Sequence, residues 1–122
     1  AAGEPTTLAE LAGGVEQIRA ETVVQAMDAG DALATRLWHE TMEYLSAGVG
    51  SLINTFNPRL IVVGGGLANA GERLFGPLRE GVQRTAMGPL AAVVEIVPAQ
   101  LGDAVGVIGA AAVARERLAE KG

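Results

Sequence analysis

Three consecutive glycines are the residues of this chain best suited to ligand chemistry. Gly64, Gly65 and Gly66 directly follow the apolar run Leu60–Val63, and a helical pattern comes after them. Glycine has no Cβ, so the backbone can adopt φ > 0 and a ligand can approach it closely. In open α/β folds, ligands bind beyond the carboxyl ends of strands, where such a turn lies. The turn is therefore the first candidate site, although a tight strand-to-helix connection without a ligand explains the glycines equally well.

Two common nucleotide-binding motifs fit this turn poorly. A P-loop has the pattern G-x-x-x-x-G-K-[ST], in which the Lys reaches the phosphates and the hydroxyl binds Mg²⁺. Gly66 and Gly71 have that spacing, but Glu72-Arg73 follow, so an acid stands where the Lys is needed. A dinucleotide fingerprint needs a third Gly or Ala and an acid at the end of the next strand. Asn69 occupies that glycine position and Glu95 lies in the middle of the next apolar run, which disfavours this motif.

A long helix is expected before the turn. Its apolar residues recur at steps of three and four along one face, and Asp31 and Pro58 bracket it. Asp31 is a suitable N-cap, and Pro58 disfavours the α conformation at the preceding Asn57. Trp38 flanks the apolar face and is expected to anchor packing or an interface. The apolar residues are Leu33, Leu37, Leu45, Val49, Leu52, Ile53 and Phe56.

A cluster of small residues, Ser46–Ser51, interrupts the long helix. Gly48 and Gly50 within it each lower helix stability by about 1 kcal/mol relative to Ala. We expect close contact with another helix, a strand or a ligand to compensate for this loss.

Strands and helices alternate after the long helix. Residues 60–63 form a continuous apolar run, which is typical of a parallel strand covered on both faces. A helix over 71–87, a strand over 93–97 ended by Pro98, and a helix over 104–119 follow. The order α-β-α-β-α predicts an α/β fold with two parallel strands joined by a right-handed crossover. Because two strands alone do not make a stable sheet, we expect part of the sheet to lie outside this chain.

The chain divides at about residue 30. Residues 1–30 are expected to form a lead-in of short helical pieces over 7–11, 15–19 and 22–27, separated by glycines. Their apolar content is thin, so we expect them to pack on a neighbour. Residues 31–122 are expected to form a partial C-terminal α/β lobe.

Composition and charge exclude several classes of function. The 122 residues suffice for one domain. The net charge of −5 gives no reason to expect the basic surface of a nucleic-acid-binding protein. The absence of Cys excludes disulfides and thiolate metal sites within this chain. No apolar stretch approaches the ~20 residues of a membrane span, and no signal-peptide pattern is visible. We therefore expect a cytoplasmic protein without a membrane partner.

Several segments of the chain together resemble the ROK (repressor, open reading frame, kinase) family. They are Asn54–Pro58, Ile61–Gly66, Ala70–Glu72 and Val97–Ala111, and Asp28–Asp31 resembles the segment before the family's long helix. The likeness extends over roughly residues 22–118, in order and at family-like spacing. It implies the C-terminal part of an actin-like ATPase (ribonuclease H-like) lobe, in a fold whose two lobes enclose a nucleotide cleft.

The resemblance also implies roles for residues of this chain. Gly64, Gly65 and Gly66 become the adenosine-binding turn, and Asn69 and Gly106 are further residues expected at the nucleotide. The helix that opens at Gly106 would be a second connection between the lobes. ATP with Mg²⁺ is the implied cofactor of the parent protein, and a homodimer is the expected assembly. Neither a catalytic residue nor a metal ligand is expected within this chain.

Other family features are missing. Family kinases carry an Asp-x-Gly-Gly-Thr phosphate loop, a catalytic Asp and a Cys-rich zinc motif, none of which maps onto this chain. We expect the chain to be a C-terminal piece of a longer protein, whose N-terminal part is its main partner. The first hypothesis is an ATP-dependent hexose kinase, inactive as this piece alone. The alternatives are a sugar-responsive transcriptional repressor, which alone of these would bind nucleic acid, and a free-standing interaction module.

Overall fold

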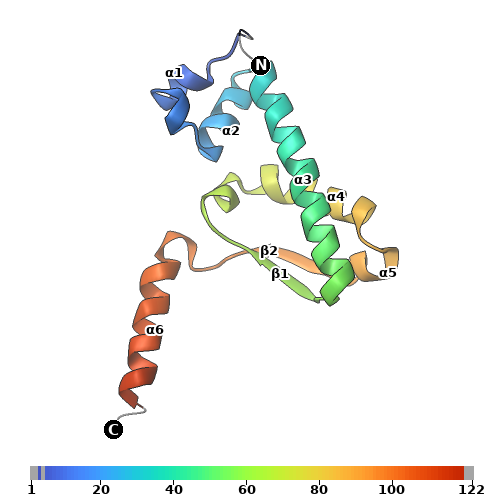
Figure 1. Cartoon of the computed structure of the whole chain (residues 1–122), viewed down its shortest axis with the longest axis vertical. Helices are drawn as coiled ribbons and strands as arrows, with labels where there is room; N and C mark the ends of the chain where they lie inside the picture. Colours follow the sequence, from blue (N-terminus) through green and yellow to red (C-terminus); the bar gives the residue numbers. More distant parts are fainter. Residues whose placement is uncertain (1–2, 4, 120–122) are drawn as a thin grey trace.

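The computed structural model describes residues 3 and 5–119, without the side chains of residues 103 and 105 (Figure 1). Its elements are α1 (Leu8–Ala12), the 3-10 helix η1 (Val15–Gln17), α2 (Ala20–Asp28), α3 (Ala32–Phe56), β1 (Leu60–Val63), the 3-10 helix η2 (Gly66–Ala70), α4 (Glu72–Thr85), α5 (Gly88–Ala91), β2 (Glu95–Pro98), the 3-10 helix η3 (Gly102–Ala104) and α6 (Val105–Ala119). The expected α-β-α-β-α order is confirmed by α3, β1, α4, β2 and α6.

The long helix α3 begins and ends at the residues that the sequence indicates. The Asp31 carboxylate accepts a hydrogen bond from the backbone N–H of Ala34 at 2.9 Å, so it caps the helix. At the other end, Asn57 adopts the left-handed conformation with φ 49°. Asn tolerates this region better than most residues, and the following Pro58 prevents the helix from continuing. Trp38 is buried in the core, which confirms its packing role.

The helices α3 and α4 pack closely through small residues. A Cβ added at Gly50 would overlap with Thr85, and one added at Gly81 would overlap with Ser46. The Thr85 hydroxyl also donates a hydrogen bond to the carbonyl oxygen of Ser46 at 3.1 Å. The expected close contact of the small-residue cluster is thus confirmed for Gly50. The space beside Gly48 is open in the described part of the chain, so the expectation does not hold there.

The two strands are parallel, and Leu60 lies opposite Glu95 at the start of the pairing. One face contacts α3 and α4, and Ile96 is buried there in the main core. The other face carries Leu60 and Val62, which are 52% and 56% exposed. The expectation that β1 is covered on both faces is therefore wrong for the described residues, because none of their elements packs on this second face.

The second strand lies slightly later in the sequence than expected and includes Pro98. The backbone N–H of Ala99 donates to the carbonyl oxygen of Val63 at 2.9 Å, and the backbone N–H of Glu95 donates to the carbonyl oxygen of Arg59 at 2.9 Å. The N–H groups of alternate residues thus make the ladder, so the missing N–H of Pro98 removes no bond between the strands. The helix α4 ends at Thr85 rather than at residue 87, because Ala86 is already extended.

The N-terminal segment is held against α3 by one carboxylate. Oδ2 of Asp31 accepts hydrogen bonds from the backbone N–H of Thr7 at 2.7 Å and from the hydroxyls of Thr6 and Thr7 at 2.9 and 3.1 Å. A small apolar cluster of Leu8, Ala26 and Ala34 lies beside these hydrogen bonds. The short helices before residue 30 therefore do pack on a neighbour, which is α3.

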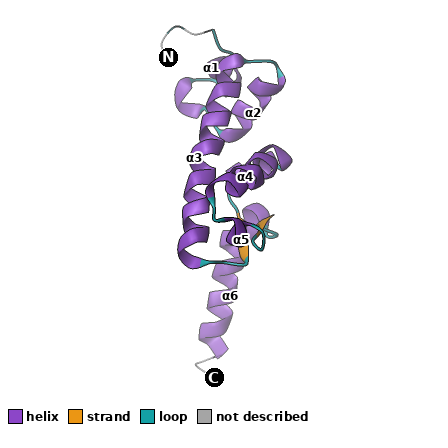
Figure 2. Ribbon diagram, turned by 90° about the vertical axis from the view of Figure 1, so that its right-hand side faces the viewer, coloured by secondary structure: helices purple, strands orange, loops and turns teal. Residues whose placement is uncertain are grey.

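The last helix, α6, extends away from the rest of the molecule (Figures 1 and 2). All of its described side chains are exposed, including Val107 at 75% and Leu118 at 73%. No helix within the described part of the chain combines the length and apolar character that crossing a membrane requires.

Candidate functional site

The glycine turn lies at the carboxyl end of β1, beside the end of β2. Gly64, Gly65 and Gly66 are all exposed, and η2 begins at Gly66. The carbonyl oxygen of Gly65 accepts a hydrogen bond from the N–H of Ala68 at 3.0 Å, which closes the turn. The position expected for a ligand in an α/β fold is therefore occupied by exposed backbone without side chains.

The fold itself accounts for two of the three glycines. A Cβ added at Gly64 would lie 3.2 Å from the Cβ of Ala99, a tight contact with the residue that follows β2. Gly65 has φ 83° and ψ −180°, which an L-residue with a side chain rarely adopts. Substitutions at Gly64 and Gly65 would therefore disturb the turn itself.

Gly66 has neither of these structural reasons. Its φ is not positive. The nearest atom to an added Cβ is Oε1 of Glu21 at 3.6 Å, an ordinary van der Waals distance. An alanine would fit here without strain, so local packing does not explain the glycine. A ligand that lies directly against the backbone is a reason that remains.

The other predicted site residues lie in two different places. Asn69 is exposed in η2, within the same loop as the three glycines. Gly106 is exposed in the first turn of α6, and nothing described lies within 4 Å of a Cβ added there. The structure thus brings Asn69 near the glycine turn but shows no contact between the Gly106 position and the turn.

Glu21 is a residue near the turn that the sequence did not reveal. It belongs to the first turn of α2; this helix contacts η2, and its residues Val23, Val24 and Met27 pack against the main core. An ion pair between Asp28 and Arg73 joins the other end of α2 to α4. Glu21 is far from the glycines in the sequence and belongs to no motif, so only the tertiary packing places it there.

A second hollow lies between α4 and β2, away from the glycine turn. This open groove has a volume of about 370 Å³ and is lined by Arg79, Val82, Gln83 and residues 94–97. Arg79 donates a hydrogen bond from Nη2 to the carbonyl oxygen of Ile96 at 3.2 Å and pairs with Glu72 at 3.2 Å. We assign no chemistry to this groove.

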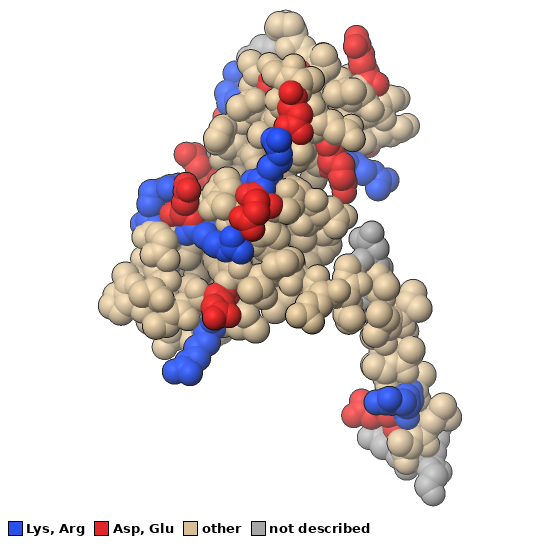
Figure 3. All heavy atoms as spheres, turned by 180° about the vertical axis from the view of Figure 1, so that it is seen from behind, with Lys and Arg blue, Asp and Glu red and all other residues tan. Residues whose placement is uncertain are grey.

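Metal ligation has no support among the described residues. They contain no group of three or more His, Cys, Asp or Glu side chains arranged to hold a metal ion. On the face shown in Figure 3, the acidic and basic side chains are intermixed, and the first part of α6 carries no charge. This face presents no basic surface of the kind that binds nucleic acid.

Comparison with known proteins identifies the family. The model of the ROK family matches residues 4–117, nearly the whole chain. This chain belongs to the ROK family. A glucokinase from Thermotoga maritima is 36% identical over 109 residues, which cover 89% of this chain and 34% of that protein. N-acetyl-D-glucosamine kinases are also among the curated relatives of this ROK chain.

Solved structures share the fold of this ROK chain. A ROK family glucokinase from Streptomyces griseus, in complex with glucose and AMPPNP, superposes with a TM-score of 0.74 and 31% identity, over 90% of this chain and 36% of that one. A ROK family transcriptional regulator, a homologue of the E. coli MLC protein, superposes with a TM-score of 0.63 and 30% identity, over 80% and 24% of the two chains. The predicted fold class, part of an actin-like lobe with two parallel strands, is confirmed. The chain spans about a third of the length of the curated relatives it matches.

Proposed function

We propose that this chain is the C-terminal, nucleotide-binding part of a ROK-type sugar kinase, in which Gly64, Gly65 and Gly66 support the adenosine. The observation that carries the proposal is Gly66, an exposed glycine at the end of a strand that neither backbone strain nor crowding explains. The nucleotide analogue and glucose in the similar Streptomyces griseus structure support this assignment. The whole protein would transfer the γ-phosphoryl group of ATP, with Mg²⁺, to a hydroxyl of a hexose.

The chain would supply binding rather than chemistry. Phosphoryl transfer depends on positioning, charge stabilisation and a base that accepts the hydroxyl proton. We assign neither the charge stabilisation nor the base to residues of this chain, and we propose that the phosphate loop, the catalytic carboxylate and the zinc motif of the family lie in the remainder of the protein. Asn69 would lie at the edge of the nucleoside. Since its described side chains are all exposed, α6 is available as the second connection between the lobes, with Gly106 at its start.

A glycine substitution tests the nucleotide site. In the full-length protein that carries this chain, we expect Gly66→Ala to raise the KM for ATP because the new methyl group occupies space beside the nucleoside. Gly48→Ala is the matched control, since Gly48 is also exposed, has no positive φ and has open space around it in α3. Equal KM values for ATP in the wild type and in Gly66→Ala would contradict the proposed nucleotide site. Turnover by the 122 residues alone would contradict the proposed division of labour.

A repressor of the same family is the second candidate, favoured by the similarity to the ROK transcriptional regulator. Its C-terminal part would serve effector response and dimerisation, and only then would nucleic acid be a partner. The upstream sequence distinguishes the two functions. An intact Asp-x-Gly-Gly-Thr loop would support the kinase, whereas a basic helix-turn-helix with a degraded loop would support the repressor. A cytoplasmic homodimer is proposed for either protein, and so is the division of the chain at residue 30.

A further inference from the structure

One carboxylate borders the space that the missing side chain of Gly66 leaves open. Oε1 of Glu21 lies 3.6 Å from the position that a Cβ of Gly66 would occupy. The side chain is exposed, in the first turn of α2. Among the described residues, Glu21 has no hydrogen-bond or ion-pair partner. A ligand that used the bare backbone at Gly66 would therefore meet an unoccupied hydrogen-bond acceptor.

The position of Glu21 is set by the helix that carries it. Val23, Val24 and Met27 of α2 pack against the main core, beside Leu67 and Ala68 of η2. The ion pair between Asp28 and Arg73 ties the end of the same helix to α4. The backbone of α2 is thus held over the turn by contacts that do not involve Glu21. A substitution of Glu21 leaves all of these contacts in place.

We propose that Glu21 selects the nucleoside at the glycine turn, by accepting a hydrogen bond from one of its N–H or O–H groups. The inference rests on the proposed nucleotide site. An ionised carboxylate only accepts hydrogen bonds, so its partner is a donor such as a ribose hydroxyl or the exocyclic amine of adenine. It also repels phosphate, because like charges close together are unfavourable. The carboxylate therefore orients the nucleoside toward α2 and the triphosphate away from it.

Nucleotide analogues test this assignment in the full-length protein that carries this chain. Calorimetric Kd values would be measured for ATP, for 2′-deoxy-ATP, which lacks a ribose hydroxyl, and for inosine triphosphate, which lacks the exocyclic amine. We expect the wild type to bind one analogue more weakly than ATP. Glu21→Ala should weaken ATP binding about tenfold or more, since a hydrogen bond to a charged group is lost, and should no longer distinguish that analogue from ATP. The weaker analogue identifies the donor.

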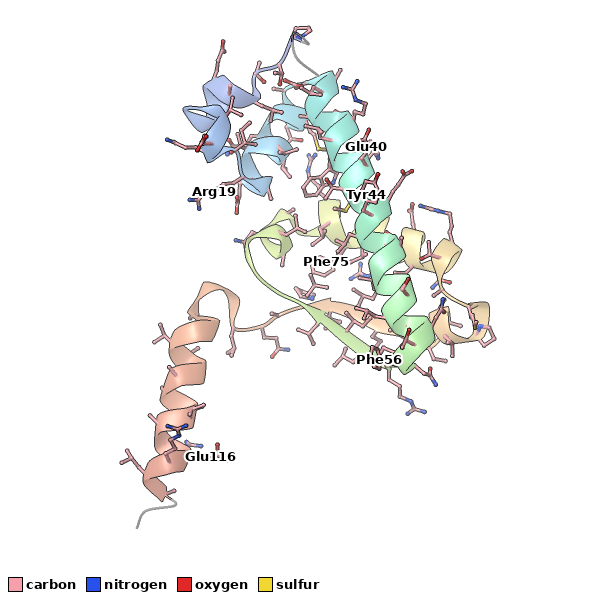
Figure 4. All side chains as sticks on the ribbon, in the orientation of Figure 1. Arg19, Glu40, Tyr44, Phe56, Phe75 and Glu116 are labelled. Atoms are coloured by element: carbon pink, nitrogen blue, oxygen red, sulfur yellow. The ribbon has the colours of Figure 1, made fainter. Side chains whose placement is uncertain are left out.

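The conservative variant and a charge control complete the test. Glu21→Gln keeps an accepting oxygen, so we expect a Kd for ATP between those of the wild type and Glu21→Ala. Glu40→Gln removes an exposed carboxylate of α3 and should change nothing (Figure 4). If the wild type binds ATP but both Glu21 variants keep its Kd and its analogue preference, the role of Glu21 is wrong and the nucleotide site stands. If the wild type binds none of the three nucleotides, both proposals are wrong.

Discussion

Trp38 compensates for the backbone N–H that Pro77 lacks, across the contact between α3 and α4. Pro77 lies inside α4 and has no N–H, so the carbonyl oxygen of Arg73 lacks its usual helical donor. The indole Nε1 of Trp38 donates to that oxygen at 3.2 Å. A residue that disrupts most helices is tolerated here because a side chain of the neighbouring helix replaces the missing bond.

This compensation predicts a coupling between the two residues. Trp38→Phe should lower the free energy of unfolding by about 1–3 kcal/mol, because the Arg73 carbonyl loses its donor. In a Pro77→Ala background the N–H of residue 77 is restored, and the same substitution should be less harmful. Urea denaturation of the four proteins measures the coupling energy. Equal losses in the two backgrounds would show that the indole bond does not replace the helical one.

Asp31 makes the stability of the fold depend on pH in the acidic range. The backbone N–H groups of Ala34 and then Thr7, with the hydroxyls of Thr6 and Thr7, lower its pKa from 3.8 to about 2, against a smaller opposing effect of burial. A carboxyl group whose pKa is lowered by folding stabilises the folded state above its unfolded pKa. That stabilisation is present above pH 3.8 and is lost as the pH falls toward 2.

Asp31→Asn tests this pH dependence. The amide cannot titrate and cannot accept as an anion, so the variant should melt at a lower temperature than the wild type at pH 6. The difference between the two proteins should shrink as the pH falls from 4 to 2. Melting curves across that range measure it by circular dichroism. A difference that stays constant with pH would mean that the ionised carboxylate contributes nothing special.

At the scale of elements, the α3–α4 contact depends on residues without side-chain bulk. Gly81→Ala should lower the free energy of unfolding by about 1–3 kcal/mol, because the added Cβ overlaps with Ser46 and the two helices must move apart. Gly48→Ala is the control in the partner helix α3, where nothing lies within 4 Å and alanine should stabilise by up to about 1 kcal/mol. Chemical denaturation measures both. Stabilisation by both substitutions would contradict the close packing.

The elements that could be predicted from sequence are those with local signals at their ends. Asp31 and Pro58 bracket α3, and the pattern of small residues correctly indicated the close contact at Gly50. The sequence predicts that the second strand ends before Pro98, because proline has no N–H for the ladder. In the structure Pro98 belongs to the strand, at a position where the ladder does not use an N–H. Glu21 could not be predicted, since its place beside Gly66 results from α2 packing on η2 and has no counterpart in local sequence.

At the scale of the whole molecule, the described residues leave large apolar surfaces uncovered. One face of the sheet exposes Leu60 and Val62, and the two-stranded sheet has unpaired edges. The helix α6 exposes Val107 and Leu118, and within the described residues its main contacts are with its own lead-in η3. In the longer ROK protein that we propose, the remaining part would cover these surfaces.

The uncovered sheet face predicts how the chain behaves alone. Exposed apolar faces and open strand edges favour pairing with other copies, so the 122 residues should form larger species as their concentration rises. Replacing Leu60 and Val62 by Thr should reduce this association, because Thr keeps the β preference while making the face polar. Val15→Thr is the matched control, since Val15 is 73% exposed but lies in η1, outside the sheet. Sedimentation velocity measures the species present. A wild-type chain that sediments only as a monomer at every concentration would show that these surfaces do not drive association. The inference that another part of the protein covers them would then rest only on the greater length of the relatives.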